Sequence, residues 1–230
     1  MELPILYEDA DLVAVDKPSG LMTHADGRTA VETAEDWFME KYPEVELERP
    51  YAHRLDRETS GVLVFAKNQN AYASLRAAFT NHEARKTYLA LVYGAPKERE
   101  GLIDFDIGRS RKDFRLRSAQ PKAKGRLRDA RTRYKVLGET GQGSEKFSLL
   151  EVRPETGRTH QIRVHLKAIH HPVVCDPLYA PNHAPALGAM RLALHAYKLD
   201  LPLPSGGRVE IVAPVPVDLR AAFARFPEAL

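Results

Sequence analysis

The segment that decides the fold reads His53-Arg54-Leu55-Asp56-Arg57-Glu58-Thr59-Ser60-Gly61-Val62-Leu63-Val64-Phe65-Ala66. Its second half is an uninterrupted apolar run, which predicts a buried strand over residues 61–66. Its first half is polar, so we expect Asp56 on a short loop at the mouth of a sheet, where functional side chains often gather.

Asp56 has neighbours that suit a working carboxylate. Arg54 and Arg57 can keep it ionised, and the hydroxyls of Thr59 and Ser60 can hold the loop. The same residue types are typical of a simple turn in which an aspartate caps nearby amides. On this stretch alone both interpretations stay open.

The rest of the chain combines short strand patterns with a few amphipathic helices. The expected strands cover residues 5–7, 12–15, 87–93, 102–107, 132–137, 147–152, 192–201 and 208–213. The expected helices cover residues 31–42, residues 71–82 with Tyr72, Leu75 and Phe79 inward, a stretch that opens near Thr159, and residues 218–226 capped by Asp218. Because strands outnumber helices and follow one another mostly through turns, we expect an α+β fold with a mixed sheet.

The composition indicates a soluble protein of one large domain or two closely packed lobes. With 230 residues, of which 43% are hydrophobic and 28% charged, the chain can bury an ordinary core. Its acidic start does not resemble a signal peptide, and no apolar stretch approaches the roughly 18 residues of a membrane span. The single cysteine, Cys175, excludes an internal disulfide, so we expect a cytoplasmic protein.

A metal site is not expected. His160 and His165 lie five residues apart, no His-Glu-x-x-His pattern is present, and Cys175 has no second thiol to share a zinc ion.

Positive charge is concentrated between Arg109 and Arg133. This segment holds eleven Lys or Arg against two Asp, a net charge of +9, which leaves −6 for the rest of the chain. Such a separation of charge is expected in a protein that binds a polyanion, and binding should then weaken steeply with salt. The alternative is a solvated loop that binds nothing.

Two further segments place polar side chains at an expected helix start and on an expected strand. Glu155-Thr156-Gly157-Arg158-Thr159-His160-Gln161-Ile162-Arg163-Val164-His165-Leu166 sets cationic and polar residues around a helix start, which attracts anions. Lys86-Thr87-Tyr88-Leu89-Ala90-Leu91-Val92 places Tyr88 on a strand. Taken alone, the first is also typical of a capped surface helix, and the second of a core tyrosine whose hydroxyl is satisfied.

In this order, the three segments resemble the sequence motifs of the RluA-type RNA pseudouridine synthases. The matching residues are His53-Arg54-Leu55-Asp56 with Thr59-Ser60-Gly61, then Lys86-Thr87-Tyr88, then Gly157-Arg158-Thr159-His160-Gln161-Ile162-Arg163-Val164-His165. The similarity extends from about Ile5 to Tyr179, although Cys175 stands where the family usually has glycine and Ala180 where glycine is common.

The resemblance implies the pseudouridine synthase catalytic fold, an α+β fold with a mixed, mostly antiparallel sheet in two lobes, flanking helices and a central active-site cleft. We therefore expect residues 1–230 to form a single catalytic domain with a basic insertion at about 109–131. Many relatives carry a small RNA-binding S4 domain before the catalytic part. We expect a short form without it.

The resemblance also implies catalytic roles. Asp56 is expected to be the nucleophile, Tyr88 to stack on the target base and to transfer a proton, and Arg163 to pair with Asp56 and keep it anionic. The family reaction needs no cofactor, and none is expected.

Further residues are expected to contact RNA. Arg54 would enter the base stack when the uridine leaves, Ile162 would form an apolar wall beside the uracil, and His53 would touch RNA or only shape the loop. The remaining expected contacts come from Thr59, Arg158, His160 and Gln161 in the motifs, and from Arg111, Arg115 and Lys122 in the basic insertion.

The expected function is the isomerisation of specific uridines to pseudouridine in structured RNA, a stem-loop of rRNA or tRNA, by a monomer with no membrane contact and no obligate protein partner. A non-catalytic RNA-binding protein would explain the charge, but not an acid, a tyrosine and an arginine in this order. A hydrolase using Cys175 beside His171 and Asp176 lacks a recognisable nucleophile setting. A phosphoryl-transfer enzyme would need a phosphate loop or clustered acids, which are missing.

Overall fold

The computed structural model describes residues 1–25, 27, 31–111, 113, 116–119 and 123–226. The chain divides into two compact units, which we describe separately. The first comprises Met1–Lys86 and Ala196–Pro214, and the second comprises Thr87–His195 and Val215–Leu230. Strands β4 (Arg85–Tyr93) and β11 (Leu194–Pro202) contribute residues to both units.

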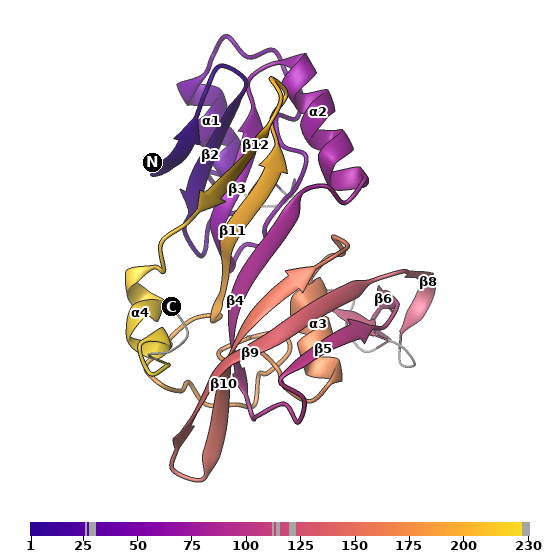
Figure 1. Ribbon diagram of the computed structural model, residues 1–230, viewed down its shortest axis with the longest axis vertical. Coiled ribbons are helices and arrows are strands. Elements are labelled where there is room, and N and C mark those ends of the chain that lie inside the picture. Colours follow the sequence, from indigo (N-terminus) through magenta and orange to yellow (C-terminus); the bar gives the residue numbers. More distant parts are fainter. Residues whose placement is uncertain (26, 28–30, 112, 114–115, 120–122, 227–230) are drawn as a thin grey trace. The chain divides into compact units, whose positions relative to one another are not determined.

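The first unit is built from strands and two helices (Figure 1). Its other strands are β1 (Ile5–Glu8), β2 (Leu12–Lys17), β3 (Ser60–Ala66) and β12 (Arg208–Val212), and its helices are α1 (Ala34–Lys41) and α2 (Gln69–Thr80). The pairs β1–β2, β2–β3 and β11–β12 are antiparallel. All seven residues of β3 are buried, which confirms the strand expected from its apolar run.

Capping residues explain where helices α1 and α2 begin. A capping box formed by Thr33 and Asp36 starts α1, and the side chain of Asn68 accepts a hydrogen bond from the Ala71 amide at the start of α2. The inner face of α2 is narrower than expected, because its buried residues are Ala71, Leu75 and Ala78, while Tyr72 and Phe79 are only partly covered.

The second unit contains a larger antiparallel sheet and a separate three-stranded one. The larger sheet has the order β4-β10-β9-β5, with β5 (Glu100–Asp104), β9 (Arg131–Gln142) and β10 (Glu145–Pro154). The small sheet has the order β7-β6-β8, with β6 (Ile107–Arg109), β7 (Arg117–Ala119) and β8 (Lys124–Arg128). The helices are α3 (Gln161–Ala168) and α4 (Val217–Phe223).

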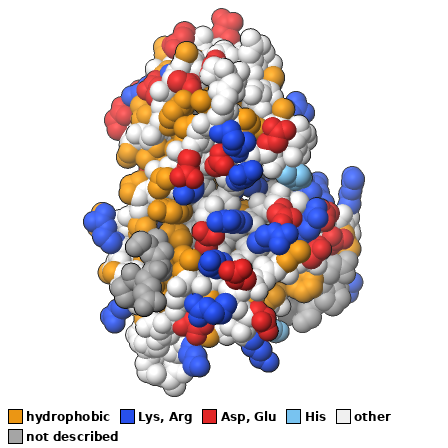
Figure 2. All heavy atoms as spheres, viewed as in Figure 1, with side chains coloured by type: hydrophobic (Ala, Val, Ile, Leu, Met, Phe, Trp, Pro, Cys, Tyr) orange, Lys and Arg blue, Asp and Glu red, His pale blue; other side chains and the backbone are white. Residues whose placement is uncertain are grey.

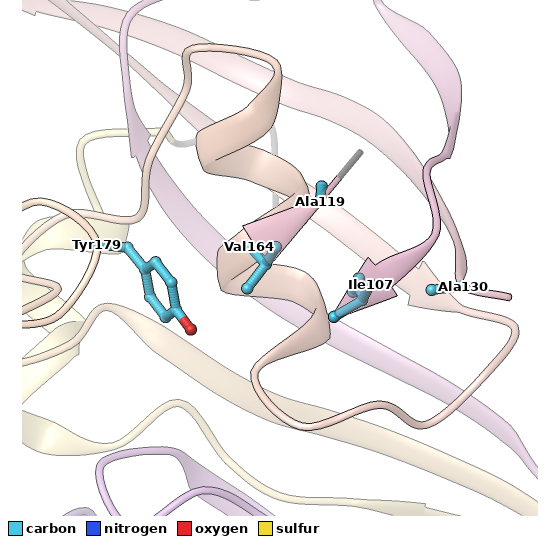
Figure 3. Close-up of a cluster of buried hydrophobic side chains, with 5 residues drawn as sticks. All are labelled: Ile107, Ala119, Ala130, Val164 and Tyr179. Carbon is cyan, nitrogen blue, oxygen red and sulfur yellow. The ribbon is translucent and has the colours of Figure 1, made fainter. Parts of the chain in front are cut away.

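The small sheet is built from the basic segment, which is therefore not a loose loop in its described part. A buried cluster of Ile107, Ala119, Ala130, Val164 and Tyr179 packs it against α3. Figure 3 shows Val164 of α3 facing Ile107 and Ala119 of this sheet. Cationic side chains of the segment are thus carried by a strand platform with its own apolar support.

The structure corrects two local predictions. The single strand expected over 102–107 is interrupted after Asp104, where the carbonyl of Phe105 turns to the ring of His165, and a new strand begins at Ile107. Asp218 does not cap α4, whose N-cap is Pro216. The Asp218 carboxylate instead binds both Nε and Nη2 of Arg191, at 2.9 and 2.8 Å.

The α+β class and the mostly antiparallel sheet with flanking helices agree with the expectation from sequence. None of the helices in the described part of the chain is long and apolar enough to cross a membrane.

Candidate active site

The loop that carries Asp56 is a tight turn at the entrance to β3. The Thr59 amide donates to the Asp56 carbonyl at 3.0 Å, and the strand begins at the next residue. Leu55 is buried, Asp56 is partly buried, and Arg54 is exposed. The apolar neighbour anchors the loop and leaves the carboxylate within reach of solvent. This is the turn that its residue types allow, joined to a fixed strand.

The buried Lys17 holds this loop by hydrogen bonds to backbone carbonyls. The ammonium group of Lys17 donates to the carbonyls of Pro18, Leu21 and Arg57, at 2.9, 2.7 and 3.2 Å, and the side chain is fully buried. The Arg57 carbonyl also accepts from the Gly20 amide at 2.9 Å, and the Arg57 Nε donates to the Gly20 carbonyl at 3.0 Å. Hydrogen bonds to a charged group are stronger than neutral ones, so Lys17 should strongly restrict the turn that follows Asp56.

His53 supports the same loop from its other end. Its Nε2 accepts a hydrogen bond from the Val64 amide at 3.1 Å, and its ring stacks on Phe79 at 4.6 Å. Burial lowers the pKa of His53 to about 3, so the ring is neutral and Nε2 is free of a proton to accept that bond. These contacts favour the loop-shaping role for His53, whereas its contact with RNA stays a prediction.

The hydroxyl of Thr59 is buried beside this turn. Its Oγ1 has no hydrogen-bond partner among the described residues, and the residue is 2% exposed. A buried hydroxyl without a partner costs roughly 1–3 kcal/mol, and such groups in folded proteins require a specific explanation. The contact with RNA that the sequence predicts for Thr59 stays a prediction.

In the second unit, Arg163 of α3 forms a buried ion pair. Its Nε and Nη2 donate to the two carboxylate oxygens of Asp176 at 2.8 and 2.7 Å, and the side chains are 3% and 0% exposed. Asp176 also accepts from the amides of Leu178 and Tyr179 at 2.9 and 3.0 Å. The guanidinium is thereby held in one orientation, with Nη1 outside the pair. The predicted pairing of Arg163 with Asp56, which lies in the other unit, stays a prediction.

Tyr179 links this ion pair to the small sheet. Its ring lies 5.1 Å from the guanidinium carbon of Arg163 and 5.6 Å from the ammonium of Lys167. Its hydroxyl accepts from the Arg117 amide at 3.0 Å and lies 2.9 Å from Nδ1 of His160. A hydroxyl that accepts from the amide can donate to the ring nitrogen, which favours the Nε2–H tautomer of His160.

Both the oxygen and the nitrogen of the Gln161 side-chain amide form hydrogen bonds within the protein. Its oxygen accepts from the Thr156 hydroxyl at 2.7 Å and the Arg158 amide at 2.9 Å. Its nitrogen donates to the Arg131 carbonyl at 2.9 Å and the Thr132 hydroxyl at 3.0 Å. Gln161 therefore ties the start of α3 to β9, and its predicted contact with RNA stays untested.

His165 is buried on the same helix. Its ring lies between the Thr132 hydroxyl and the Phe105 carbonyl, both at 2.9 Å, and burial lowers its pKa. With Arg163 and Gln161 also buried, α3 is not the surface helix that its polar residues alone would allow.

The other predicted residues occupy varied settings. Tyr88 lies near the start of β4, opposite Val152 of β10, and is partly buried. Ile162 is buried at the start of α3, and Arg111 is exposed. Arg115 and Lys122 lie outside the described residues.

Three supporting residues received no role in the predicted active site. Lys17, Asp176 and Tyr179 belong to the similarity that flanks the three motifs, and Asp176 was otherwise named only in the hydrolase alternative. The signal that could have found them is the pairing of a charged residue with a rigid turn, Lys17-Pro18-Ser19-Gly20 and Asp176-Pro177, directly after an apolar run.

Among the described residues, no group of three or more His, Cys, Asp or Glu side chains is arranged to hold a metal ion.

Comparisons with curated proteins find relatives along most of the chain. An uncharacterized RNA pseudouridine synthase of Chloroflexus aurantiacus is 43% identical over 209 residues, which are 89% of this chain and 63% of the relative. One from Synechocystis is 37% identical over 220 residues, 93% of this chain and 66% of the relative. The ribosomal large subunit pseudouridine synthase D of Nitrosomonas europaea is 38% identical over 232 residues, 95% and 64%. The chain thus spans slightly less than two thirds of these relatives.

Solved structures show the same fold. The human RNA pseudouridylate synthase domain containing 1 superposes with a TM-score of 0.76 at 29% identity, over 94% of this chain and 84% of that one. The human RNA pseudouridylate synthase domain containing 4 gives a TM-score of 0.77 at 24% identity, over 97% and 93%. The family model described as RNA pseudouridylate synthase matches residues 11–168, which include all three motifs. The chain therefore belongs to the RNA pseudouridylate synthase family, of the RluA type.

Proposed function

We propose that the chain is an RNA pseudouridine synthase, an isomerase that converts uridines of structured rRNA or tRNA into pseudouridine without a cofactor. The observation that carries the proposal is the setting of Asp56. A carboxylate in the family's first motif lies on a turn that the buried Lys17 ties, through the Arg57 carbonyl, to the segment of Pro18 and Leu21. A catalytic group must be held in place by its own support, and this loop provides it.

In the proposed reaction the C1′–N1 glycosidic bond of a uridine breaks, the detached uracil turns, and C5 joins C1′. The proton on C5 is then lost and N1 gains one, so the product is an isomer of uridine. Asp56 supplies the ionised oxygen, whether it attacks the sugar, adds to the base or promotes elimination. Each route requires the uridine to leave its stack, and this costs less in an RNA loop than in a duplex.

The other motif residues take supporting roles in this proposal. Tyr88 packs against the uracil and transfers a proton, Arg163 keeps Asp56 anionic, and Ile162 lines the base site. Arg54 is exposed next to the loop, and in this proposal its planar guanidinium replaces the extruded base in the stack. His160 and Arg158 contribute contacts from the start of α3.

The basic segment is proposed to hold the RNA backbone. Reversing the charges of Arg111, Arg115 and Lys122 should weaken RNA binding and reduce its dependence on salt, because fewer phosphates are then neutralised. An unchanged affinity and an unchanged salt slope in the triple variant would remove this role from the segment.

The activity is tested with RNA that carries tritium at C5 of uridine. Wild-type protein should release the label from rRNA or tRNA, and Asp56→Ala and Asp56→Asn should reduce the rate by more than about 10³-fold. Glu58→Gln is the matched control, because it removes the neighbouring carboxylate of the same turn and should retain release. Thermal melting checks that all variants fold. Equal release by wild type and Asp56→Asn would refute the assignment.

A further inference from the structure

A pocket lined by arginines lies at the edge of the small sheet. Its lining residues are Arg126, Leu127, Arg128, Asp129 and Arg158, and its volume is about 390 Å³. All five belong to the second unit. Three guanidinium groups against one carboxylate make the pocket cationic, and Arg126 and Arg128 are two residues apart on β8, so their side chains leave the strand on the same side.

Two hydrogen bonds within the protein hold Arg158 in position. Its Nε donates to the Asp129 carbonyl at 2.8 Å, and its amide donates to Gln161, which ties the residue to the fixed start of α3. The one carboxylate of the pocket already has a cation, since the Arg131 Nη2 lies 3.7 Å from Asp129. The remaining charge of the pocket is therefore available to an anion.

The arginines of β8 differ in their ion pairing from those of β9, the next strand along the chain. On β9, Arg131 and Arg133 share the carboxylate of Glu155. Arg126 and Arg128, in contrast, are exposed and form no ion pair with any described carboxylate. Figure 2 shows lysine and arginine side chains interleaved with acidic ones over the face where Figure 1 draws β9. The charges on β9 are thus largely satisfied within the protein, and those on β8 are not.

A row of like charges runs across the same sheet. Arg109 of β6 is paired directly with Arg117 of β7 on one side and with Lys124 of β8 on the other. Directly opposed like charges on adjacent strands destabilise a sheet, and a polyanion bound beside this row would offset the repulsion. The apolar cluster that packs the sheet on α3 keeps the cations on a fixed support (Figure 3).

We propose that Arg126, Arg128 and Arg158 form a binding site for a backbone phosphodiester of the RNA. The proposal rests on the proposed function for the identity of the RNA, but it concerns binding and not catalysis. Planar guanidinium groups suit two phosphate oxygens at once, and the adjoining row of cations continues the positive surface beyond one phosphate. That continuation favours a phosphodiester chain over a small free phosphate.

The test compares two double variants of equal charge change. Arg126→Gln/Arg128→Gln removes two of the three arginines, and Arg220→Gln/Arg225→Gln removes two exposed arginines at the end of α4 that form no ion pair in the described chain. Dissociation constants for a fluorescent uridine-containing RNA hairpin are measured by anisotropy at several salt concentrations. The slope of log affinity against log salt should fall by about 1 for each phosphate that is no longer neutralised. The first variant should therefore lower the slope by about 1, because its two arginines hold one phosphate, and the second variant should leave the slope unchanged.

Further outcomes separate the possibilities. The weakening should be equal for a hairpin with a scrambled loop, because backbone contacts carry no sequence information. An unchanged slope in Arg126→Gln/Arg128→Gln would overturn the site, even if wild type releases tritium. A changed slope would support it, even if wild type releases none and the proposed activity fails. Saturable binding of uridine monophosphate that is abolished in the double variant, with RNA binding intact, would identify a small-phosphate site and overturn the proposal.

Discussion

Asp176→Asn should strongly destabilise the protein, because it removes the charge that Arg163 faces in the interior. Both side chains are almost fully buried, and both carboxylate oxygens accept from the guanidinium. The asparagine oxygen can still accept from the Leu178 and Tyr179 amides, so the local turn is preserved. The guanidinium then stays buried but loses its bidentate partner, and breaking a buried pair in this way costs about 3–5 kcal/mol.

The matched control is Asp218→Asn, which breaks a bidentate pair with Arg191 at the surface. The Asp218 side chain is 56% exposed, so solvent screens the pair and its removal should cost less than about 1 kcal/mol. Urea denaturation at pH 7 gives the free energy of unfolding of each variant, provided the denaturant slope stays constant. Arg163→Gln/Asp176→Asn, which removes both charges of this pair, should recover part of the stability. If Asp176→Asn cost no more than Asp218→Asn, the reasoning from burial would be refuted.

Three further changes test the loop of Asp56. The pKa of His53 is about 3 in the folded protein and about 6.5 in the unfolded chain, so between these pH values the unfolded chain binds more protons and stability falls as pH drops. At pH 5 this histidine should lower the free energy of unfolding by about 2 kcal/mol relative to neutral pH. Urea titrations of His53→Gln should lack this decrease. Thr59→Val removes a buried hydroxyl without a described partner, so it should raise the free energy of unfolding by up to about 1 kcal/mol while lowering tritium release, and destabilisation would contradict this account. Gly61→Ala should destabilise by about 2–6 kcal/mol, because φ is +114° and a Cβ would collide with the Ala196 backbone; Gly206→Ala, with φ +97° and open space, should cost far less in the same assay.

The parts of the fold that depend on local pattern could be predicted from the sequence. The β1–β2 hairpin, the buried strand β3 and the helix α2 follow from apolar runs and from capping residues within a few positions. The break between β5 and β6 could not be predicted in this way, since it depends on a contact from Phe105 to His165, sixty positions later. The pattern of residues 102–107 contains no signal of that contact.

The cap expected for α4 failed for a similar reason. An aspartate at a helix start is a good N-cap when it has no stronger partner. Asp218 has one, because Arg191 donates to both of its oxygens, and this lowers the pKa of the carboxyl. The helix also begins before Asp218, at Val217, so this carboxylate lies inside the helix and binds a partner that only the tertiary structure supplies.

Helix α3 shows most clearly where sequence reasoning reaches its limit. Its polar residues suggested either an anion-binding helix start or a solvated surface helix, and the structure buries them instead. Each finds a partner far away in sequence: Arg163 finds Asp176, Gln161 finds β9, and His165 finds Thr132. Buried polar groups are tolerated only when such partners exist, so a dense set of them on one short helix requires a rigid, specific surround. That requirement gives a physical reason for the polar residues of the third motif that does not depend on contact with RNA.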